Sequence, residues 1–317
     1  MGNSVNAQGG KNAPLVIIFA GPNGSGKSTT NAEILNDPEL NFKGEYINAD
    51  DIAKALANEI SDYRKRNIKA AEIAVQRRQT AMNENRTFAF ETVMSTPEKV
   101  AIMTQAKAKN YDVALYFITT DNPEINVARV EARVAKGGHA VDPDAIRRRY
   151  HSTMDLLPCA VEHADSARII DNSGNKSVSV AIKRSDRLTQ IKPNLPEWVD
   201  EKLVKPYRDR EASREKIKQS YKAECERAST SATMLTDADA SHGKTYKGKI
   251  IDVTVHHALQ QTGANKFVIH DRSLSIPQEL QKGKQATIAY AYDKGKIVAP
   301  MQGKGSRAQK RSALRRM

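Results

Sequence analysis

Aromatic residues and long apolar runs are scarce in this sequence of 317 residues. Aromatics make up 5 % of the chain and charged residues 27 %, a balance typical of proteins with long, solvent-exposed helices. No apolar run approaches the roughly 18 residues that a transmembrane helix needs. The polar segment 1–14 contains no apolar stretch that could act as a secretory signal. We therefore expect a cytoplasmic protein without a membrane partner.

Cysteine is also rare, with only Cys159 and Cys225 in the whole chain. Two distant cysteines cannot form a disulfide framework, and neither has a second Cys or a His at a metal-ligand spacing. We expect both to be ordinary thiols in a reducing compartment. This excludes the disulfide-stabilised class of small secreted domains.

Acidic residues are under-represented in only one part of the chain. Residues 1–180 contain 22 Lys and Arg and 22 Asp and Glu. Residues 181–317 contain 28 Lys and Arg against 15 Asp and Glu, so the whole net charge of +13 belongs to them. The tail 303–317 has six basic residues and no acidic one. This excess predicts nucleic acid as a partner of the C-terminal half, and the alternative is a solvated basic face that binds nothing.

Short apolar runs alternate with amphipathic segments over the first half of the chain. Strands are predicted at 15–20, 45–48, 87–90, 113–118 and 167–170. The predicted helices cover about 28–36, 51–61, 63–84, 97–109, 123 to the glycine pair at 137–138, and 142–156. This alternation indicates an α/β fold with an open, mostly parallel sheet flanked by helices. In such sheets ligands bind at the carboxyl ends of the strands.

The C-terminal part changes character several times. A charged helical segment is followed by a Ser/Thr/Ala/Asp-rich stretch, and then by strand-like runs at 249–255, 267–270 and 286–292. These runs predict a small all-β domain. The predicted division of the chain is an α/β domain at 1–190, a charged helical segment at 191–227, a linker at 228–245, a β domain at 246–300 and a basic tail at 301–317.

The nine residues after the first predicted strand match the pattern G-x-x-x-x-G-K-[ST] and lead directly into a helix. Backbone N–H groups of such a loop curl around phosphates, and the helix N-terminus adds positive potential. Lys27 is expected to reach the β- and γ-phosphates of ATP or GTP, and the Ser28 hydroxyl to bind Mg²⁺. The sheet is therefore of the P-loop kinase type. The predicted phosphate-binding residues are Gly21, Pro22, Asn23, Gly24, Ser25, Gly26, Lys27, Ser28 and Thr29.

Two carboxylates follow the second and third predicted strands. We interpret Asp50 as the base that accepts a proton from an acceptor hydroxyl, and its alternative role is the N-cap of the next helix, for which Asp51 competes. Glu91 ends a strand where a buried charge is unexpected, so we interpret it as a contact to a substrate hydroxyl or a metal-bound water. Its alternative is a capping role together with Thr92.

Arginines are concentrated in the two helices predicted after 113–118. Arg129 and Arg133 lie on one face of the first helix, and Arg147, Arg148 and Arg149 are consecutive in the second. Kinases need arginines that neutralise the transferring phosphoryl group. Because three consecutive side chains of a helix point in different directions, at most two of the three can serve.

These motifs occur in an order that resembles the zeta-toxin family over residues 14–175. The matching segments are Gly21–Thr29, Asn48–Asp50, Phe90–Ser95, Ile118–Thr120, Asn126–Val141 and Ile146–Tyr150. The resemblance implies a small kinase that uses ATP or GTP with Mg²⁺. Its implied substrate is a sugar hydroxyl of UDP-N-acetylglucosamine or a related UDP-amino sugar. It also implies the role of toxin, neutralised by a small antitoxin protein.

The resemblance also implies roles for individual residues. Lys27 and Ser28 would hold the phosphates and Mg²⁺, Asp50 would be the base, and Arg133 with Arg149 would stabilise the transferring phosphate. The residues implied to bind the sugar nucleotide are Asn48, Glu91, Thr92 and Ser95. The family often has threonine where this sequence has Val93, a departure that puts the identity of the acceptor in doubt.

The C-terminal β segment resembles the KfrB-type domain of plasmid-borne proteins. The resemblance lies in 246–253, 257–263, 268–271 and 283–290, and it implies that the protein belongs on a mobile element. We interpret the histidines of this segment, His256, His257 and His270, as surface or core residues rather than metal ligands. Two other functions stay open: a P-loop kinase for another small hydroxyl compound, and a plasmid maintenance or transfer protein with a DNA-binding C-terminal half.

Overall fold

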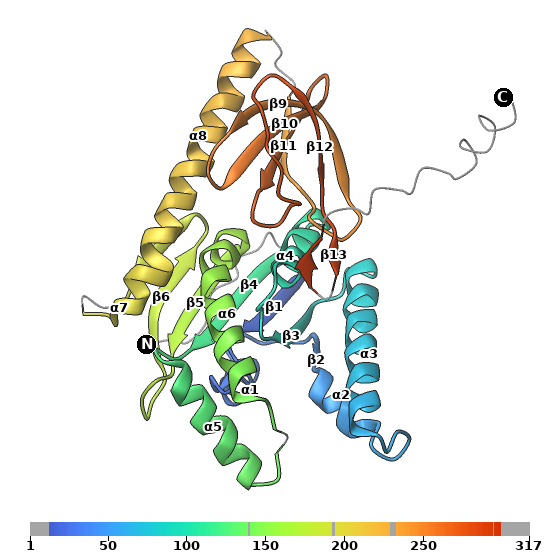
Figure 1. Ribbon diagram of the computed structural model, residues 1–317, viewed down its shortest axis with the longest axis vertical. Coiled ribbons are helices and arrows are strands. Elements are labelled where there is room, and N and C mark those ends of the chain that lie inside the picture. The colour runs from blue at the N-terminus through green and yellow to red at the C-terminus, as the bar shows by residue number, and fades with distance from the viewer. Residues whose placement is uncertain (1–12, 139, 192–193, 229–232, 294, 299–317) are drawn as a thin grey trace, which may run out of the picture.

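The computed structural model of the protein describes residues 13–298 except 139, 192–193, 229–232 and 294 (Figure 1). The basic tail predicted at 301–317 lies outside the described residues, as does part of the linker predicted at 228–245. Among the described helices, none is both long enough and apolar enough to cross a bilayer.

The first half of the chain forms a seven-stranded sheet in the order β2-β3-β1-β4-β5-β6-β7. The strands β1 to β5 pair in parallel, and β6 and β7 add to one edge in antiparallel orientation. Its strands are β1 (Leu15–Ala20), β2 (Glu45–Ile47), β3 (Phe88–Thr92), β4 (Asp112–Thr119), β5 (Ser166–Asp171), β6 (Val178–Arg184) and β7 (Arg187–Gln190). The predicted α/β class and its mostly parallel sheet are confirmed.

The central strand β1 explains why this sheet forms. It consists entirely of apolar residues, and every residue after Leu15 is fully buried, as expected for a parallel strand covered on both faces. In the register of the sheet, Ile18 pairs with Phe90 of β3 and with Leu115 of β4. The apolar core therefore lies directly beneath the loop that follows β1.

Helices cover both faces of this sheet (Figure 1). One face packs against α1, and the other packs against α3, α4 and α6. The helices are α1 (Lys27–Leu35), α2 (Ala49–Ala55), α3 (Tyr63–Asn83), α4 (Pro97–Ala108), α5 (Pro123–Ala135) and α6 (Pro143–His163). The crossovers bring the carboxyl ends of β1, β2, β3 and β4 to one edge, where the predicted site residues follow the strands.

Three predicted helix boundaries are wrong. The helix α2 ends at Ala55, well before residue 61. It begins at Ala49, because Asn48 rather than Asp51 is its N-cap: the Asn48 side chain accepts a hydrogen bond from the backbone N–H of Asp50. The helix α6 continues past Leu156 through Pro158 to His163. Nearly all residues of this extension are buried against the sheet, and this packing outweighs the helix-breaking tendency of proline.

The chain then forms a long helix and a second sheet. The residues after β7 form α7 (Glu197–Val199), the π-helical turn η1 (Asp200–Val204) and α8 (Lys205–Arg227). The second sheet has the order β12-β9-β10-β11-β8. Its strands are β8 (Met234–Asp237), β9 (Thr245–Val253), β10 (His257–Gly263), β11 (Lys266–Asp271) and β12 (Gln285–Ala289), followed by the hairpin of β13 (Tyr292–Asp293) and β14 (Lys296–Ile297).

The predicted linker is therefore wrong at 234–237, which form β8 and pair in parallel with β11. The strand β10 was not predicted either, because its sequence contains two glutamines. One of them, Gln260, is fully buried and donates hydrogen bonds to the carbonyl oxygens of Gly248 and Ala286. Hydrogen bonds from a buried side chain to the backbone thus stabilise β10, whose sequence lacks the apolar alternation of most strands.

The helix α8 and the α/β part enclose the second sheet from two sides. Ile217 of α8 packs against Ile251, Leu259 and Ile269 on one face of this sheet. Residues of its other face, such as Val268, belong to the same apolar core as α4 and α6. The segments are therefore joined by continuous packing, and Figure 1 shows α8 running from the α/β part along the second sheet.

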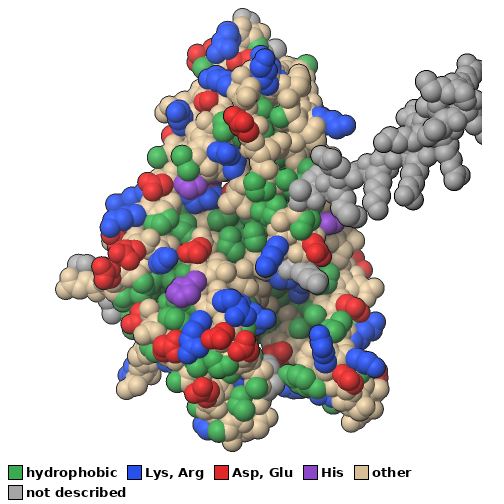
Figure 2. All heavy atoms as spheres, in the orientation of Figure 1, with side chains coloured by type: hydrophobic (Ala, Val, Ile, Leu, Met, Phe, Trp, Pro, Cys, Tyr) green, Lys and Arg blue, Asp and Glu red, His purple; other side chains and the backbone are tan. Residues whose placement is uncertain are grey.

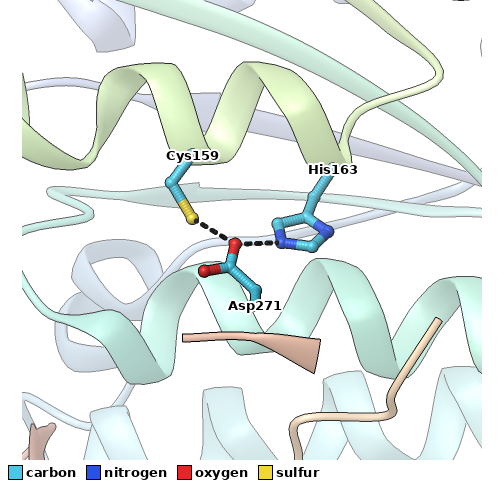
Figure 3. Close-up of side chains that lie close together, drawn as sticks. All are labelled: Cys159, His163 and Asp271. Carbon is cyan, nitrogen blue, oxygen red and sulfur yellow. Dashed lines mark hydrogen bonds and ion pairs between the residues drawn. The ribbon is translucent and has the colours of Figure 1, made fainter. Parts of the chain in front are cut away.

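A buried polar cluster lies where these parts meet (Figure 3). Asp271, at the end of β11, accepts hydrogen bonds from the thiol of Cys159 (3.2 Å), from Nε2 of His163 (2.9 Å) and from the guanidinium of Arg210. These four residues are all buried and come from α6, α8 and β11. The same Arg210 also donates to Oε2 of Glu162 at 2.6 Å. One arginine therefore ties the α/β part to the second sheet.

Positive and negative side chains are interspersed over both parts of the molecule on the face shown in Figure 2. The two halves of the sequence differ in net charge, but this face shows no sharp boundary between a neutral part and a basic part (Figure 2). The predicted contact with nucleic acid gains no support from this face.

Candidate active site

The predicted P-loop, residues 21–29, connects β1 to α1 and can only be built with its glycines. Gly21, Gly24 and Gly26 have φ values of 146°, 77° and 92°, which L side chains rarely adopt. A Cβ on Gly21 would also lie 1.9 Å from the carbonyl oxygen of Ile118 in β4. The loop thus packs tightly against the neighbouring strand, with the N-terminus of α1 beneath it.

Lys27 occupies the first position of α1 and is 6 % exposed. Its Nζ donates hydrogen bonds to the carbonyl oxygens of Gly21 (2.9 Å) and Pro22 (2.8 Å), and it lies 3.7 Å from Oε1 of Glu91. Burial lowers the pKa of Lys27, while the charges of Glu91 and Asp50 oppose this effect. The amine is therefore held at the loop by two backbone carbonyls and by the Glu91 carboxylate.

Glu91 is the centre of a second group of hydrogen bonds, at the end of β3. Its Oε2 accepts from Nδ2 of Asn31 (3.0 Å), from Oγ of Ser28 (3.3 Å) and from the hydroxyl of Tyr46 (3.4 Å). Of the Glu91–Thr92 pair, it is Thr92 that caps the local turn, because its Oγ1 accepts a hydrogen bond from the backbone N–H of Met94 at 3.1 Å. The Glu91 carboxylate instead faces the P-loop.

These groups border one cavity of about 480 Å³ at the carboxyl edge of the sheet. Most of the predicted site residues line it. The predicted residues on its wall are Asn23, Gly24, Gly26, Lys27, Ser28, Thr29, Asn48, Asp50, Glu91, Thr92 and Arg133. The predicted residues that do not line it are Gly21, Pro22, Ser25, Ser95 and Arg149.

Asp50 lies in the first turn of α2 and lines the cavity. Because Asn48 caps this helix, the Asp50 side chain is not needed for that purpose. The two polar ends of Asn48 are both engaged, since its Nδ2 donates to the Tyr46 hydroxyl at 3.1 Å. Asn48 therefore shapes the wall of the cavity, and the Asp50 carboxylate on the same wall acts on Lys27 by its charge, which raises the pKa of that amine.

The arginines separate into different environments. Arg133 lines the cavity, together with Arg129 from the same face of α5. Arg149 donates from Nη1 to Oδ1 of Asn23 in the P-loop at 3.3 Å. Arg147 is instead paired with Glu124 at 2.7 Å. Of the three consecutive arginines, Arg149 is thus the one that reaches the loop, from just outside the cavity wall.

Several residues at the site were not predicted. Asn31 lies one helical turn after Lys27, and its spacing of four residues was the available signal. Tyr46 precedes the predicted Asn48 by two residues in a strand, so both side chains point to the same face. Val93 also lines the cavity.

Three groups of side chains offer ligand atoms for a cation. Ser28, Asp50 and Glu91 have the hard oxygen ligands that Mg²⁺ prefers, and all three line the cavity. Potential ligand atoms also come together in Cys159, His163 and Asp271 (Figure 3), and in Glu162, His257 and Asp271. Asp271, however, already accepts a hydrogen bond from Arg210, whose guanidinium supplies the positive charge there. The first group therefore fits a metal ion, and the two groups that share Asp271 do not.

Comparison with known proteins agrees with this geometry. The family model for the zeta toxin matches residues 4–194, and that for the KfrB domain matches residues 245–299. An uncharacterized protein of Haemophilus influenzae is 31 % identical over 134 residues, which are 42 % of this chain and 91 % of that protein.

Two solved structures have similar chains. A structure from the PezAT chromosomal toxin–antitoxin system of Streptococcus pneumoniae is 17 % identical, with a TM-score of 0.41 over 52 % of this chain and 71 % of that one. A crystal structure of AvrRxo1-ORF1:-ORF2 with ATP is 13 % identical, with a TM-score of 0.47 over 56 % of this chain. This chain covers 61 % of that AvrRxo1 chain.

The zeta toxin match extends over more than half of the chain and contains the whole cavity described above. The P-loop is therefore the nucleotide-binding loop of a toxin kinase, and the strands β9 to β12 of the second sheet lie in the residues that match the KfrB domain. The chain belongs to the zeta toxin family.

Proposed function

We propose that this protein transfers the γ-phosphoryl group of ATP or GTP to a sugar hydroxyl of UDP-N-acetylglucosamine or a related UDP-amino sugar. The observation that carries the proposal is that two carboxylates, Asp50 and Glu91, line one cavity together with Lys27 and Arg133. A site that only binds nucleotide needs the lysine and the loop. A carboxylate in the same cavity can accept the proton of a hydroxyl acceptor. The choice of a UDP-sugar rests on membership of the family.

In the proposed reaction, the N–H groups of the P-loop and Lys27 hold the β- and γ-phosphates, so Lys27 exchanges its bonds to the carbonyls of Gly21 and Pro22 for phosphate oxygens. Asp50 accepts the proton of the acceptor hydroxyl as the oxygen of that hydroxyl bonds to the γ-phosphorus. The bond from that phosphorus to the bridging oxygen breaks, and the nucleoside diphosphate leaves. Arg133 and Arg149 neutralise charge on the transferring group.

Mg²⁺ would be held by the Ser28 hydroxyl, with Glu91 beside it, and when bound it would neutralise charge on the phosphates. In the described structure Ser28 and Glu91 hydrogen-bond directly to each other. Glu91 is thus also placed to contact the acceptor sugar once the nucleotide has drawn Ser28 and Lys27 toward its phosphates.

We further propose that this activity is that of a toxin in the cytoplasm, held in check by a small antitoxin protein. The support is membership of the zeta toxin family, together with the toxin–antitoxin system to which the similar Streptococcus pneumoniae structure belongs. The KfrB domain suggests a mobile element as the source.

The decisive experiment is to incubate the full chain with Mg²⁺ and ATP or GTP and a panel of UDP-sugars, and to measure the mass of each product. We expect a gain of one phosphate on a UDP-amino sugar, lost in Asp50→Asn but kept in the matched control Asp51→Asn, whose carboxylate does not line the cavity. Phosphate on another hydroxyl compound, with every UDP-sugar unchanged, would replace the substrate in this proposal. Turnover by Asp50→Asn at the wild-type rate would refute its role as base.

A further inference from the structure

Two asparagines behind the P-loop hold its carbonyl oxygens. Nδ2 of Asn126, in α5, donates to the carbonyl oxygen of Asn23 at 2.6 Å. Nδ2 of Asn172, just after β5, donates to the carbonyl oxygen of Ser25 at 2.8 Å. Both amides come from elements far along the chain, and neither side chain lines the cavity.

Each asparagine is itself fixed. Asn126 is fully buried, and its Oδ1 accepts a hydrogen bond from the hydroxyl of Thr120 at the end of β4. The backbone N–H of Asn172 donates to the carbonyl oxygen of Thr119 at 2.7 Å. The two amides are therefore positioned by the rigid end of the central sheet and not by the loop that they contact.

The glycines of the loop fit these two contacts. A Cβ on Gly24 would lie 2.4 Å from the backbone oxygen of Asn126, and a Cβ on Gly26 would lie 2.3 Å from Nδ2 of Asn172. Side chains at either position would push the asparagines away. The two asparagines can therefore contact the loop only because glycine stands at positions 24 and 26.

The planarity of the peptide bond fixes the direction of two N–H groups in the loop. In a trans peptide, the C=O of one residue and the N–H of the next point in opposite directions. Because the Asn23 carbonyl is turned toward Asn126, the N–H of Gly24 is turned away from it. In the same way, the Ser25 carbonyl at Asn172 turns the N–H of Gly26 away. Gly24 and Gly26 both line the cavity, so these N–H groups are available to phosphate oxygens.

We propose that Asn126 and Asn172 are positioning residues that preset the P-loop for a triphosphate before the nucleotide arrives. They fix two peptide planes, so that binding does not have to reorient them. This inference rests on the proposed function only in that a nucleoside triphosphate occupies this loop; it does not depend on the acceptor.

The test is direct titration of the full chain with a fluorescent ATP analogue in the presence of Mg²⁺. Asn126→Leu and Asn172→Leu remove the donor without adding charge, and Asn126→Asp and Asn172→Asp place a carboxylate against the carbonyl oxygen. We expect the leucine variants to weaken affinity for the analogue roughly two- to tenfold, the loss typical of one hydrogen bond between neutral groups. The aspartate variants should weaken it further, because a carboxylate and a carbonyl oxygen repel each other. The control Asn175→Asp adds the same charge on the exposed side of the same turn and is expected to bind as the wild type does.

A second readout separates positioning from general damage. The KM for the nucleotide should rise in the variants, while the KM for the acceptor stays near wild type. In the Asn172 variants the urea midpoint of unfolding should also stay near wild type, because this residue is only half-buried. Asn172, which is only half-buried, keeps the test open if the Asn126 variants fail to fold. Wild-type affinity for the analogue in folded Asn172→Leu and Asn172→Asp would overturn the inference. A wild-type chain that does not bind the analogue at all would instead overturn the proposed kinase function, and the inference with it.

Discussion

Replacing Arg210 by methionine should be among the most destabilising single changes in this protein. Arg210 is 4 % exposed and donates to both Glu162 and Asp271, whose side chains are 7 % and 4 % exposed. Methionine fills most of the same volume but leaves two buried carboxylates without their shared cation. Breaking one partner out of a buried ion pair typically costs about 3–5 kcal/mol.

The neighbouring contacts set where in that range the loss should fall. Glu162 would keep a hydrogen bond with His257 at 2.7 Å, and Asp271 would keep those with Cys159 and His163. These partners can hold some of the freed charge, so we expect a loss near 3 kcal/mol. A whole domain is stable by only about 5–15 kcal/mol, so the loss is easily measured.

The assay is urea unfolding followed by the fluorescence of Trp198, the single tryptophan of the chain. This residue is buried next to η1, and its Nε1 donates to Oδ2 of Asp171 at the end of β5. The control is Arg227→Met, which removes an ion pair of 2.7 Å to Glu224 on the same helix, but with an arginine that is 72 % exposed. Exposed pairs contribute about 0–1 kcal/mol. If Arg210→Met and Arg227→Met lowered the free energy of unfolding by the same small amount, the argument from burial would be refuted.

Two further predictions concern acid stability and the C-terminal tail. Burial raises the pKa of Glu162, but the hydrogen bond from His257 and the charge of Arg210 outweigh it and lower the pKa to about 2. Because this folded-state pKa is below the ordinary value of 4.5, the stabilisation is present above about pH 4.5 and is lost as the pH falls toward 2. Glu162→Gln should flatten this acid limb of stability in urea titrations, and an unchanged slope would contradict the prediction. Deletion of 303–317 should leave kinase activity intact and reduce both DNA affinity and its salt dependence, and an unaltered affinity would refute a nucleic-acid role for the tail.

The sequence was informative wherever a signal was local. The run of six apolar residues at 15–20 predicted β1 with the bounds that the structure has, because a strand buried on both faces needs an uninterrupted apolar sequence. The pattern of the P-loop predicted the cavity, because its glycines, lysine and serine are consecutive. In contrast, β3 continues through Glu91 and Thr92, since backbone pairing with β1 does not depend on polarity.

The supports of the site could not be predicted in the same way. Asn126 is 103 residues from the loop residue that it contacts, and Asn172 is 147 residues from its own partner. An asparagine after a strand or in a first helical turn is common, and nothing in its local sequence says which carbonyl it will meet. Such contacts follow only from the order of the strands, which brings the ends of β1, β4 and β5 together.

The contact between the α/β part and the second sheet was also not predicted from the sequence. Charge counting separated a neutral half from a basic half, whereas in the structure Asp271 of the KfrB domain is bound by residues of α6 and α8. The opposite half of α6 carries Arg149, which contacts the P-loop, and Thr153, which donates to the carbonyl oxygen of Val93 on the cavity wall at 2.9 Å. One helix therefore contacts both the KfrB domain and residues at the active site. We predict that a change at the junction that shifts α6 alters kinase activity.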